Sequence, residues 1–220
     1  MLDIAIIEKK IGYRIKDKSL ITTAFTHASF SPYSYEKLEF LGDSVLSLVV
    51  TEYLYQNYPD FDEGELTKAR AQVVDKPPLK QVIMSIGIEK YIQIGSGERQ
   101  NHLEQSDKLC GDLFEAVLGA IYLDGGYDEA KKFVLSGLEK TINEVVKNKE
   151  ALTDYKSKLF ELCQKKRIEK RFEYEKEGED HEPVFTAILY LDEKEVARAK
   201  GTSKKKAEQV ACRICLKSCF

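Results

Sequence analysis

The stretch that decides the fold is residues 36–46, with the sequence EKLEFLGDSVL. Placed on a helix at about 100° per residue, Glu36, Glu39 and Asp43 share one narrow arc. The opposite arc is apolar and extends past the quoted stretch, through Leu38, Leu41, Val45, Leu48 and Val49. The spacing therefore predicts a helix with its apolar side in a core and three carboxylates on its other side.

A second stretch, residues 112–121 with the sequence DLFEAVLGAI, repeats this pattern. Asp112 and Glu115 lie three residues apart on one face, where like charges destabilise a helix by about 0.2–0.5 kcal/mol per pair. No Lys or Arg shares the first acidic arc, and only Lys108 lies near the second. Either helix alone could be a solvated acidic face, but two such faces on strongly apolar helices favour a bound cation.

The chemistry of these side chains indicates which cation to expect. Carboxylates without His or Cys suit a hard ion, Mg²⁺ with Mn²⁺ able to substitute, rather than zinc. The glycines of the stretch GSGE at 95–98 lack the further Gly and helix start of a nucleotide-binding fingerprint, so no nucleotide cofactor is expected.

The composition is typical of a globular protein. The 220 residues, 43% of them hydrophobic and 32% charged, have room for one medium domain and a small one. The apolar residues 4–7 are followed at once by charged ones, which leaves the segment too short for a signal peptide or membrane span. The odd number of Cys and the helix-like spacing of Cys212, Cys215 and Cys219 favour reduced thiols, an apolar helix face and a cytoplasmic protein.

The charge is divided unevenly along the chain. Residues 151–220 hold 16 Lys and Arg against 13 Asp and Glu, whereas the rest holds 18 against 24. The acidic part is predicted to be helical throughout. The basic part is predicted to run helix, three strands, helix, and Lys204, Lys205 and Lys206 lie where its last helix begins. Ammonium groups and free backbone N–H groups at such a terminus can hold phosphates together.

At these residues the chain resembles a known family. Residues 36–46 resemble the signature of the ribonuclease III family, residues 112–116 resemble its second acidic motif, and the basic part resembles the double-stranded RNA-binding domain. The resemblance implies a multidomain protein: an all-α catalytic domain over 1–147, a linker over 148–153, and a small α+β domain of order α-β-β-β-α over 154–220. It further implies a cytoplasmic Mg²⁺-dependent endoribonuclease that cuts both strands of double-stranded RNA with metal-activated water, leaving 5′-phosphate and 3′-hydroxyl ends, in rRNA and mRNA processing and decay.

The resemblance also assigns roles to single residues. Glu39, Asp112 and Glu115 are expected as metal ligands, with Asp43 and Glu115 as the catalytic carboxylates and Asp43 orienting the attacking water. Rim positions of the active site fall to Glu36 and Glu63, although Glu63 could simply complement a helix dipole.

In the RNA-binding domain, Glu161 is expected to face sugar hydroxyls and His181 to enter the next minor groove. The chain departs from the family pattern at Phe160, where many members carry Gln, and at Glu208, where many carry Lys. These departures predict a modest affinity of the isolated domain for RNA.

A staggered double cut needs two active sites, which implies a homodimer. Phe40 projects beside the carboxylate arc, so it is covered either by another helix of its own domain or by a partner chain. The resemblance to the family favours burial by a partner. Two other functions are open: a binding protein that uses RNA only as a scaffold, and an unrelated helical metal phosphohydrolase acting on nucleotides. The full set of acids argues against the first, and the absence of His from both acid motifs argues against the second.

Overall fold

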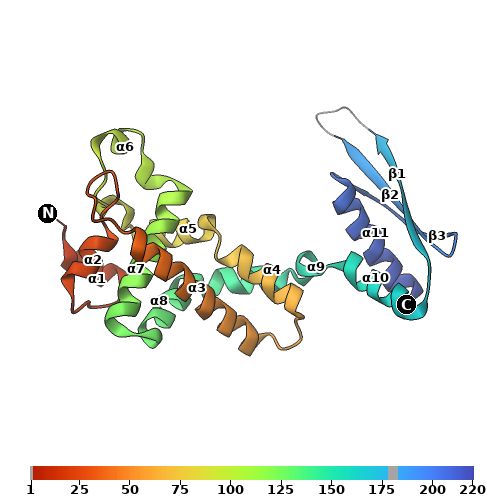
Figure 1. The fold of residues 1–220 in the computed structure, drawn as a ribbon, viewed down its shortest axis with the longest axis horizontal. Helices are drawn as coiled ribbons and strands as arrows, with labels where there is room; N and C mark the ends of the chain where they lie inside the picture. The colour runs from red at the N-terminus through yellow and green to blue at the C-terminus, as the bar shows by residue number, and fades with distance from the viewer. Residues whose placement is uncertain (1, 178–182) are drawn as a thin grey trace. The chain divides into compact units, whose positions relative to one another are not determined.

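A computed structural model describes residues 2–177 and 183–220, which form two compact units, Met1–Leu152 and Thr153–Phe220 (Figure 1). The linker expected over 148–153 differs from the structure, because Lys149–Leu152 forms a short helix, α9. Leu152 is buried in the core of the first unit, so most of this charged segment belongs to that unit.

The first unit is built from helices (Figure 1). They are α1 (Ile4–Ile11), α2 (Lys18–Ala24), α3 (Glu36–Asn57), α4 (Glu63–Val73), α5 (Lys76–Ile86), α6 (Ser96–Gln100), α7 (Asp107–Gly125), α8 (Tyr127–Lys147) and α9, with 3₁₀ turns at Glu89–Tyr91 and Leu103–Gln105. Among the described residues of this unit, extended pairing is limited to an isolated bridge between Thr26 and Gln93. The predicted all-α architecture is confirmed.

Local sequence signals account for the ends of the helices that carry the site. Asp75 caps α5, whose first turn holds two prolines that need no hydrogen-bond partner there. Ser106 caps α7 by accepting a hydrogen bond from the N–H of Leu109. Helix α3 ends at Asn57, two residues before Pro59.

Helix α7 runs through the middle of the unit, and α3 crosses it at very short range. A Cβ at Gly42 of α3 would lie 1.8 Å from the carbonyl oxygen of Glu115, and a Cβ at Gly119 of α7 would lie 2.3 Å from the carbonyl oxygen of Leu38. The two glycines therefore let the backbones touch, and this contact brings the two acid faces together.

The same contact moves the buried side of α3 away from the predicted one. Leu46 and Val50 are fully buried, whereas Leu48, expected in the core, is 56% exposed. The reason is that α7 packs over Gly42, which lies between the acidic arc and the apolar arc. The core side of α3 is thereby turned toward Leu46, and Leu48 is left on the surface.

The second unit contains α10 (Tyr155–Lys166), β1 (Lys170–Glu177), β2 (Val184–Leu191), β3 (Lys194–Gly201) and α11 (Lys204–Cys219). The strands form one antiparallel sheet in the order β1-β2-β3, as expected from the α-β-β-β-α reading. The core includes Leu159, Leu189 and three free cysteines, at 163, 212 and 215. Cys212 and Cys215 thus lie on the expected apolar face of α11, whereas Cys219 is exposed. None of the described helices combines the length and apolarity needed to cross a membrane.

Candidate active site

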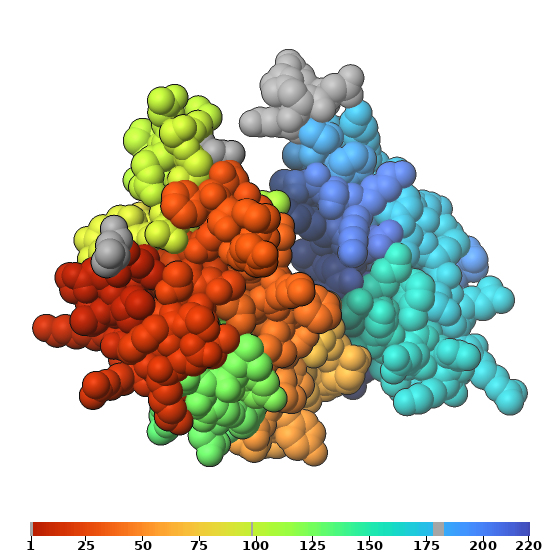
Figure 2. Space-filling model, turned by 60° about the vertical axis from the view of Figure 1, so that its left-hand side comes forward, coloured from red at the N-terminus to blue at the C-terminus, as the bar shows by residue number. Residues whose placement is uncertain are grey.

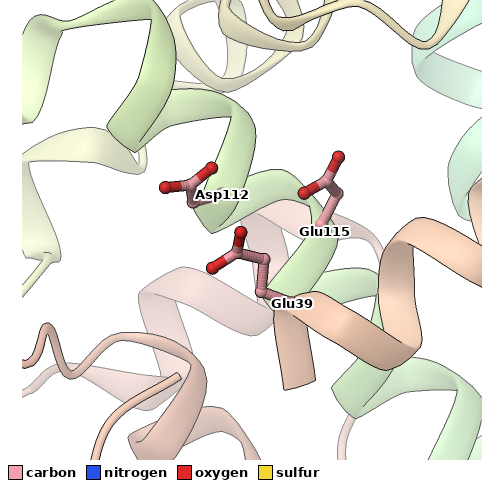
Figure 3. A group of neighbouring side chains, drawn as sticks. All are labelled: Glu39, Asp112 and Glu115. Atoms are coloured by element: carbon pink, nitrogen blue, oxygen red, sulfur yellow. The ribbon is translucent and has the colours of Figure 1, made fainter. Parts of the chain in front are cut away.

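Three predicted metal ligands meet where α3 crosses α7. Glu39 comes from α3, while Asp112 and Glu115 come from successive turns of α7 (Figure 3). Each offers one carboxylate oxygen to a group in which all three atoms lie within 4.8 Å of one another. Residues that are 73 positions apart in the chain thus point into one small volume.

The cluster is strained electrostatically because it is buried. Asp112 and Glu115 are each only 4% exposed. Burial raises the pKa of Glu115 to about 7, although hydrogen bonding to Lys76 acts in the opposite direction, and the nearby charges of Asp43 and Asp112 add to the rise. Burial, followed by the charge of Asp112, also raises the pKa of Glu39 above its usual value. A positive charge at this place would relieve the repulsion.

Part of that positive charge comes from Lys76, which sequence reasoning missed. Its Nζ lies 2.8 Å from Oδ1 of Asp112 and 2.8 Å from Oε2 of Glu115. The expectation that only Lys108 lies near this pair is therefore wrong. Lys76 stands at the start of α5, and no spacing along the chain could place it against α7. Lys108 lies nearby as well, in a hollow that it lines with Glu39 and Asp112.

Asp43 and Glu36 border the cluster without belonging to it. Both are exposed and line an open hollow together with Glu39, Lys76 and Glu115. Glu36 also lines the neighbouring hollow that contains Lys108, and its carboxylate accepts a hydrogen bond of 3.0 Å from the hydroxyl of Ser34. The structure therefore places Asp43 and Glu36 at the open side of the cluster formed by half-buried Glu39 and buried Asp112 and Glu115.

Glu63 lies elsewhere in the first unit. It begins α4 and lines a separate hollow with Thr51, Tyr55 and Arg70, among others. Thr51 and Tyr55 are 12 and 16 residues along α3 from Glu39, which corresponds to about 18–24 Å of helix. Within one chain, Glu63 is thus not on the rim of the acid cluster.

Phe40 has no cover among the described residues. It is 79% exposed, and Tyr55 and Leu48 on the same helix are 74% and 56% exposed. At 100° per residue, these three side chains fall within one stripe about 80° wide. Orange surface belonging to α3 is visible on the face of the first unit turned toward the viewer in Figure 2. The possibility that its own domain roofs Phe40 is excluded.

In the second unit, the three predicted phosphate-binding lysines are exposed at the start of α11. Lys204, Lys205 and Lys206 make up its first turn, which Ser203 caps by accepting a hydrogen bond from the N–H of Lys206. Glu161 is exposed on α10. His181 lies outside the described residues.

The two departures from the family pattern lie close together beside these lysines. Glu208 is 8% exposed and accepts hydrogen bonds from Lys156 and from the hydroxyl of Tyr174, so its charge is paired. The rings of Phe160 and Phe172 stack with their centroids 6.4 Å apart, and Nζ of Lys156 lies 5.5 Å from the centroid of the Phe160 ring. The reduced affinity expected from these two residues stays a prediction.

Comparison with known families agrees with this division into two units. A model described as Ribonuclease-III-like matches residues 17–142, and one described as Double-stranded RNA binding motif matches residues 155–218. A helical nuclease unit with a carboxylate cluster, followed by a unit for duplex RNA, defines an endoribonuclease of double-stranded RNA.

Individual relatives extend the match over nearly the full chain. Ribonuclease 3 of Aliarcobacter butzleri is 39% identical over 221 residues, covering 98% of this chain and 97% of that protein. Ribonuclease 3 of Borreliella burgdorferi is 41% identical over 207 residues, covering 90% of this chain and 84% of that protein. The nuclease domain of ribonuclease III from Campylobacter jejuni, at 37% identity and a TM-score of 0.61, covers 63% of this chain and 97% of its own. The chain belongs to the ribonuclease III family.

Proposed function

We propose that this protein hydrolyses both strands of double-stranded RNA with Mg²⁺, which Mn²⁺ can replace, leaving 5′-phosphate and 3′-hydroxyl ends. We assign it to the processing and decay of rRNA and mRNA precursors in the cytoplasm. The observation that carries this proposal is the convergence of Glu39, Asp112 and Glu115 within 4.8 Å beside an open hollow.

The donor set fits a hard divalent cation. All three donors are carboxylate oxygens, and the described residues add no His or Cys to the group. Burial raises the pKa of Glu115, which disfavours its charged form, and a bound cation would favour that form. When bound, such an ion supplies a more acidic water and neutralises charge on the phosphate.

The protein's own side chains would then position the reactants. Asp43 faces the hollow from α3, next to Glu115, where its carboxylate can accept a hydrogen bond from the attacking water and orient it. Glu39, Asp112 and Glu115 would hold the ion, the last two from buried positions on α7. Glu36, on the open side, would contact the RNA strand or limit how it approaches.

RNA binding is assigned mainly to the second unit. Lys204, Lys205 and Lys206 are exposed at a capped helix terminus, where ammonium groups and N–H groups can bind phosphates. Glu161 on α10 would face ribose hydroxyls, which distinguish RNA from DNA.

We further propose that the protein acts as a homodimer through the exposed stripe of Phe40, Leu48 and Tyr55 on α3. Large apolar side chains grouped in this way mark contact surfaces. The related Campylobacter jejuni nuclease domain has a region described as involved in dimer formation. A rim role for Glu63 would require a second copy to carry it to an acid cluster, because its own is about 18–24 Å of helix away.

Replacing Glu115 by Gln tests the assignment. The change preserves volume and removes one ligand charge, so cleavage of labelled duplex RNA in Mg²⁺ should be abolished. Binding of the same RNA should stay near the parent value, because RNA binding is assigned mainly to the other unit.

Glu144→Gln is the matched control, since Glu144 is exposed on α8 and pairs only loosely with Lys140, at 3.9 Å. Near-parent cleavage by the Glu115→Gln protein would refute the metal site. Cleavage of mononucleotide substrates in place of duplex RNA would support the phosphohydrolase alternative.

A further inference from the structure

The ammonium of Lys76 occupies part of the volume that the acid cluster offers to a cation. We propose that Lys76 is an internal counter-ion: it pairs with Asp112 and Glu115 in the metal-free protein and must leave them before a divalent ion binds. The lysine thereby competes with the metal and sets the ion concentration at which the site fills. This inference rests on the metal site proposed above.

The ammonium of Lys76 is held by two buried carboxylates, unlike that of a typical surface lysine. Its Nζ lies 2.8 Å from one oxygen of each carboxylate, and those two side chains are only 6% and 5% exposed. A divalent ion held by the same two residues would bring three positive charges into a small buried volume. Repulsion there is poorly screened, so the ammonium and the ion exclude one another.

The backbone of α7 is shaped to admit this side chain. A Cβ at Gly111 would lie 2.2 Å from Cδ of Lys76, so the lysine stem passes directly over the glycine. Helix α5 starts at Lys76 and is capped by Asp75, which places the lysine at the helix end that meets α7. The absence of a side chain at 111 is what lets the ammonium reach both carboxylates.

Lys80 provides an internal comparison, one turn further along α5. Its Nζ lies 2.7 Å from Oδ1 of Asp107, a carboxylate that is 57% exposed and lies outside the cluster. The two lysines therefore share a helix and a similar ion-pair distance, but only Lys76 faces the proposed metal ligands.

The test measures Mn²⁺ binding to the full-length protein by electron paramagnetic resonance, together with the unfolding temperature in EDTA. Lys76→Met should bind Mn²⁺ about tenfold more tightly, within the 5–150-fold range common for two coupled ligands. Its unfolding temperature in EDTA should fall, because the buried carboxylates lose their partner. Lys80→Met should match the parent in Mn²⁺ affinity. Gly111→Ala, which displaces the lysine stem, should tighten Mn²⁺ binding in the same direction as Lys76→Met.

Unchanged or weaker Mn²⁺ binding by Lys76→Met, or equal tightening by Lys80→Met, would overturn the proposal. If Lys76→Met does not fold, the Gly111→Ala variant is the test instead. A Mn²⁺ affinity of Gly111→Ala equal to that of the parent would then overturn the proposal. The parent protein and Glu39→Gln separate this result from the metal site itself. Binding by the parent that is lost in Glu39→Gln supports the site, whereas no binding by the parent refutes the site and not merely the role of Lys76.

Discussion

Replacing Gly42 by Ala tests the contact that assembles the active site. A Cβ at this position would lie 1.8 Å from the carbonyl oxygen of Glu115, and real Cβ atoms essentially never approach closer than 3.0 Å. Helices α3 and α7 would therefore have to separate by about 1.2 Å or more. Because the opposing atom belongs to the backbone, no side chain can turn aside to make room.

The expected loss of stability follows from two opposing effects. Overpacking a core costs about 1–3 kcal/mol, and a backbone contact places this site at the upper end. Alanine recovers about 1 kcal/mol of helix propensity relative to glycine. The net loss of about 2 kcal/mol should lower the unfolding temperature by about 4–8 °C, using about 2–4 °C per kcal/mol for a chain of this size.

Thermal unfolding in EDTA measures this effect, with Gly64→Ala as the control. A Cβ at Gly64 would meet only Oδ1 of Asp62, at 3.4 Å, so that variant should not lose stability. Cleavage of duplex RNA per folded molecule should fall about 100-fold in Gly42→Ala, since a displacement of about 1 Å between catalytic groups costs that much. A Gly42→Ala protein with the parent's unfolding temperature and cleavage rate would refute the close crossing.

Three other predictions concern the dimer, the domains and pH. Phe40→Ala should shift the protein to monomer in light scattering, since truncating an aromatic that is buried at the proposed dimer interface costs about 3–5 kcal/mol. Phe40→Asp should do so more completely, because its charge would also have to be desolvated. An unchanged dimer in both variants would exclude this interface. Removing residues 153–220 should preserve cleavage at low salt and abolish it at moderate salt, because phosphate contacts weaken with salt. If the truncated protein folds but is inactive at every salt concentration, the nuclease domain is not autonomous. The raised pKa of Glu115, about 7 when folded against 4.5 ordinarily, means that the folded state binds this proton more tightly. The metal-free protein should therefore lose stability as pH rises from about 4.5 to 7 in urea unfolding, and Glu115→Gln should show a shallower decline.

Both acid faces could be predicted from spacing because helical periodicity determines which side chains share a face. Glu36, Glu39 and Asp43 lie on one side of α3, and Asp112 and Glu115 on one side of α7, regardless of what surrounds these helices. Alternation of side chains and helix-capping residues likewise indicated the α-β-β-β-α order of the second unit. These features depend on neighbours within a few positions.

The errors concern pairs of helices. Leu48 was expected in the core and lies on the surface, because α7 packs over Gly42 rather than over the centre of the apolar arc. Glu63 lines a different hollow within one chain, so its expected rim role stays a prediction that depends on a second copy. Lys76 was not expected near either acid face and contacts two of its carboxylates. A glycine within a helical pattern signals that another helix can pack closely there, but it does not reveal which helix that is.

The sequence by itself thus determined the helix faces, the order of elements and the resemblance to the ribonuclease III family, because these are recorded in local spacing and motif. The resemblance grouped Glu39 with Asp112 and Glu115, but only the tertiary structure decided how closely they meet. It alone also decided that Lys76 pairs with Asp112 and Glu115 and that Phe40 stays uncovered. Each of these depends on how closely two helices approach and how they are rotated. That geometry is set by side-chain volume at the crossing points, such as the missing Cβ atoms of the glycines on α3 and α7, and not by the period of either helix alone.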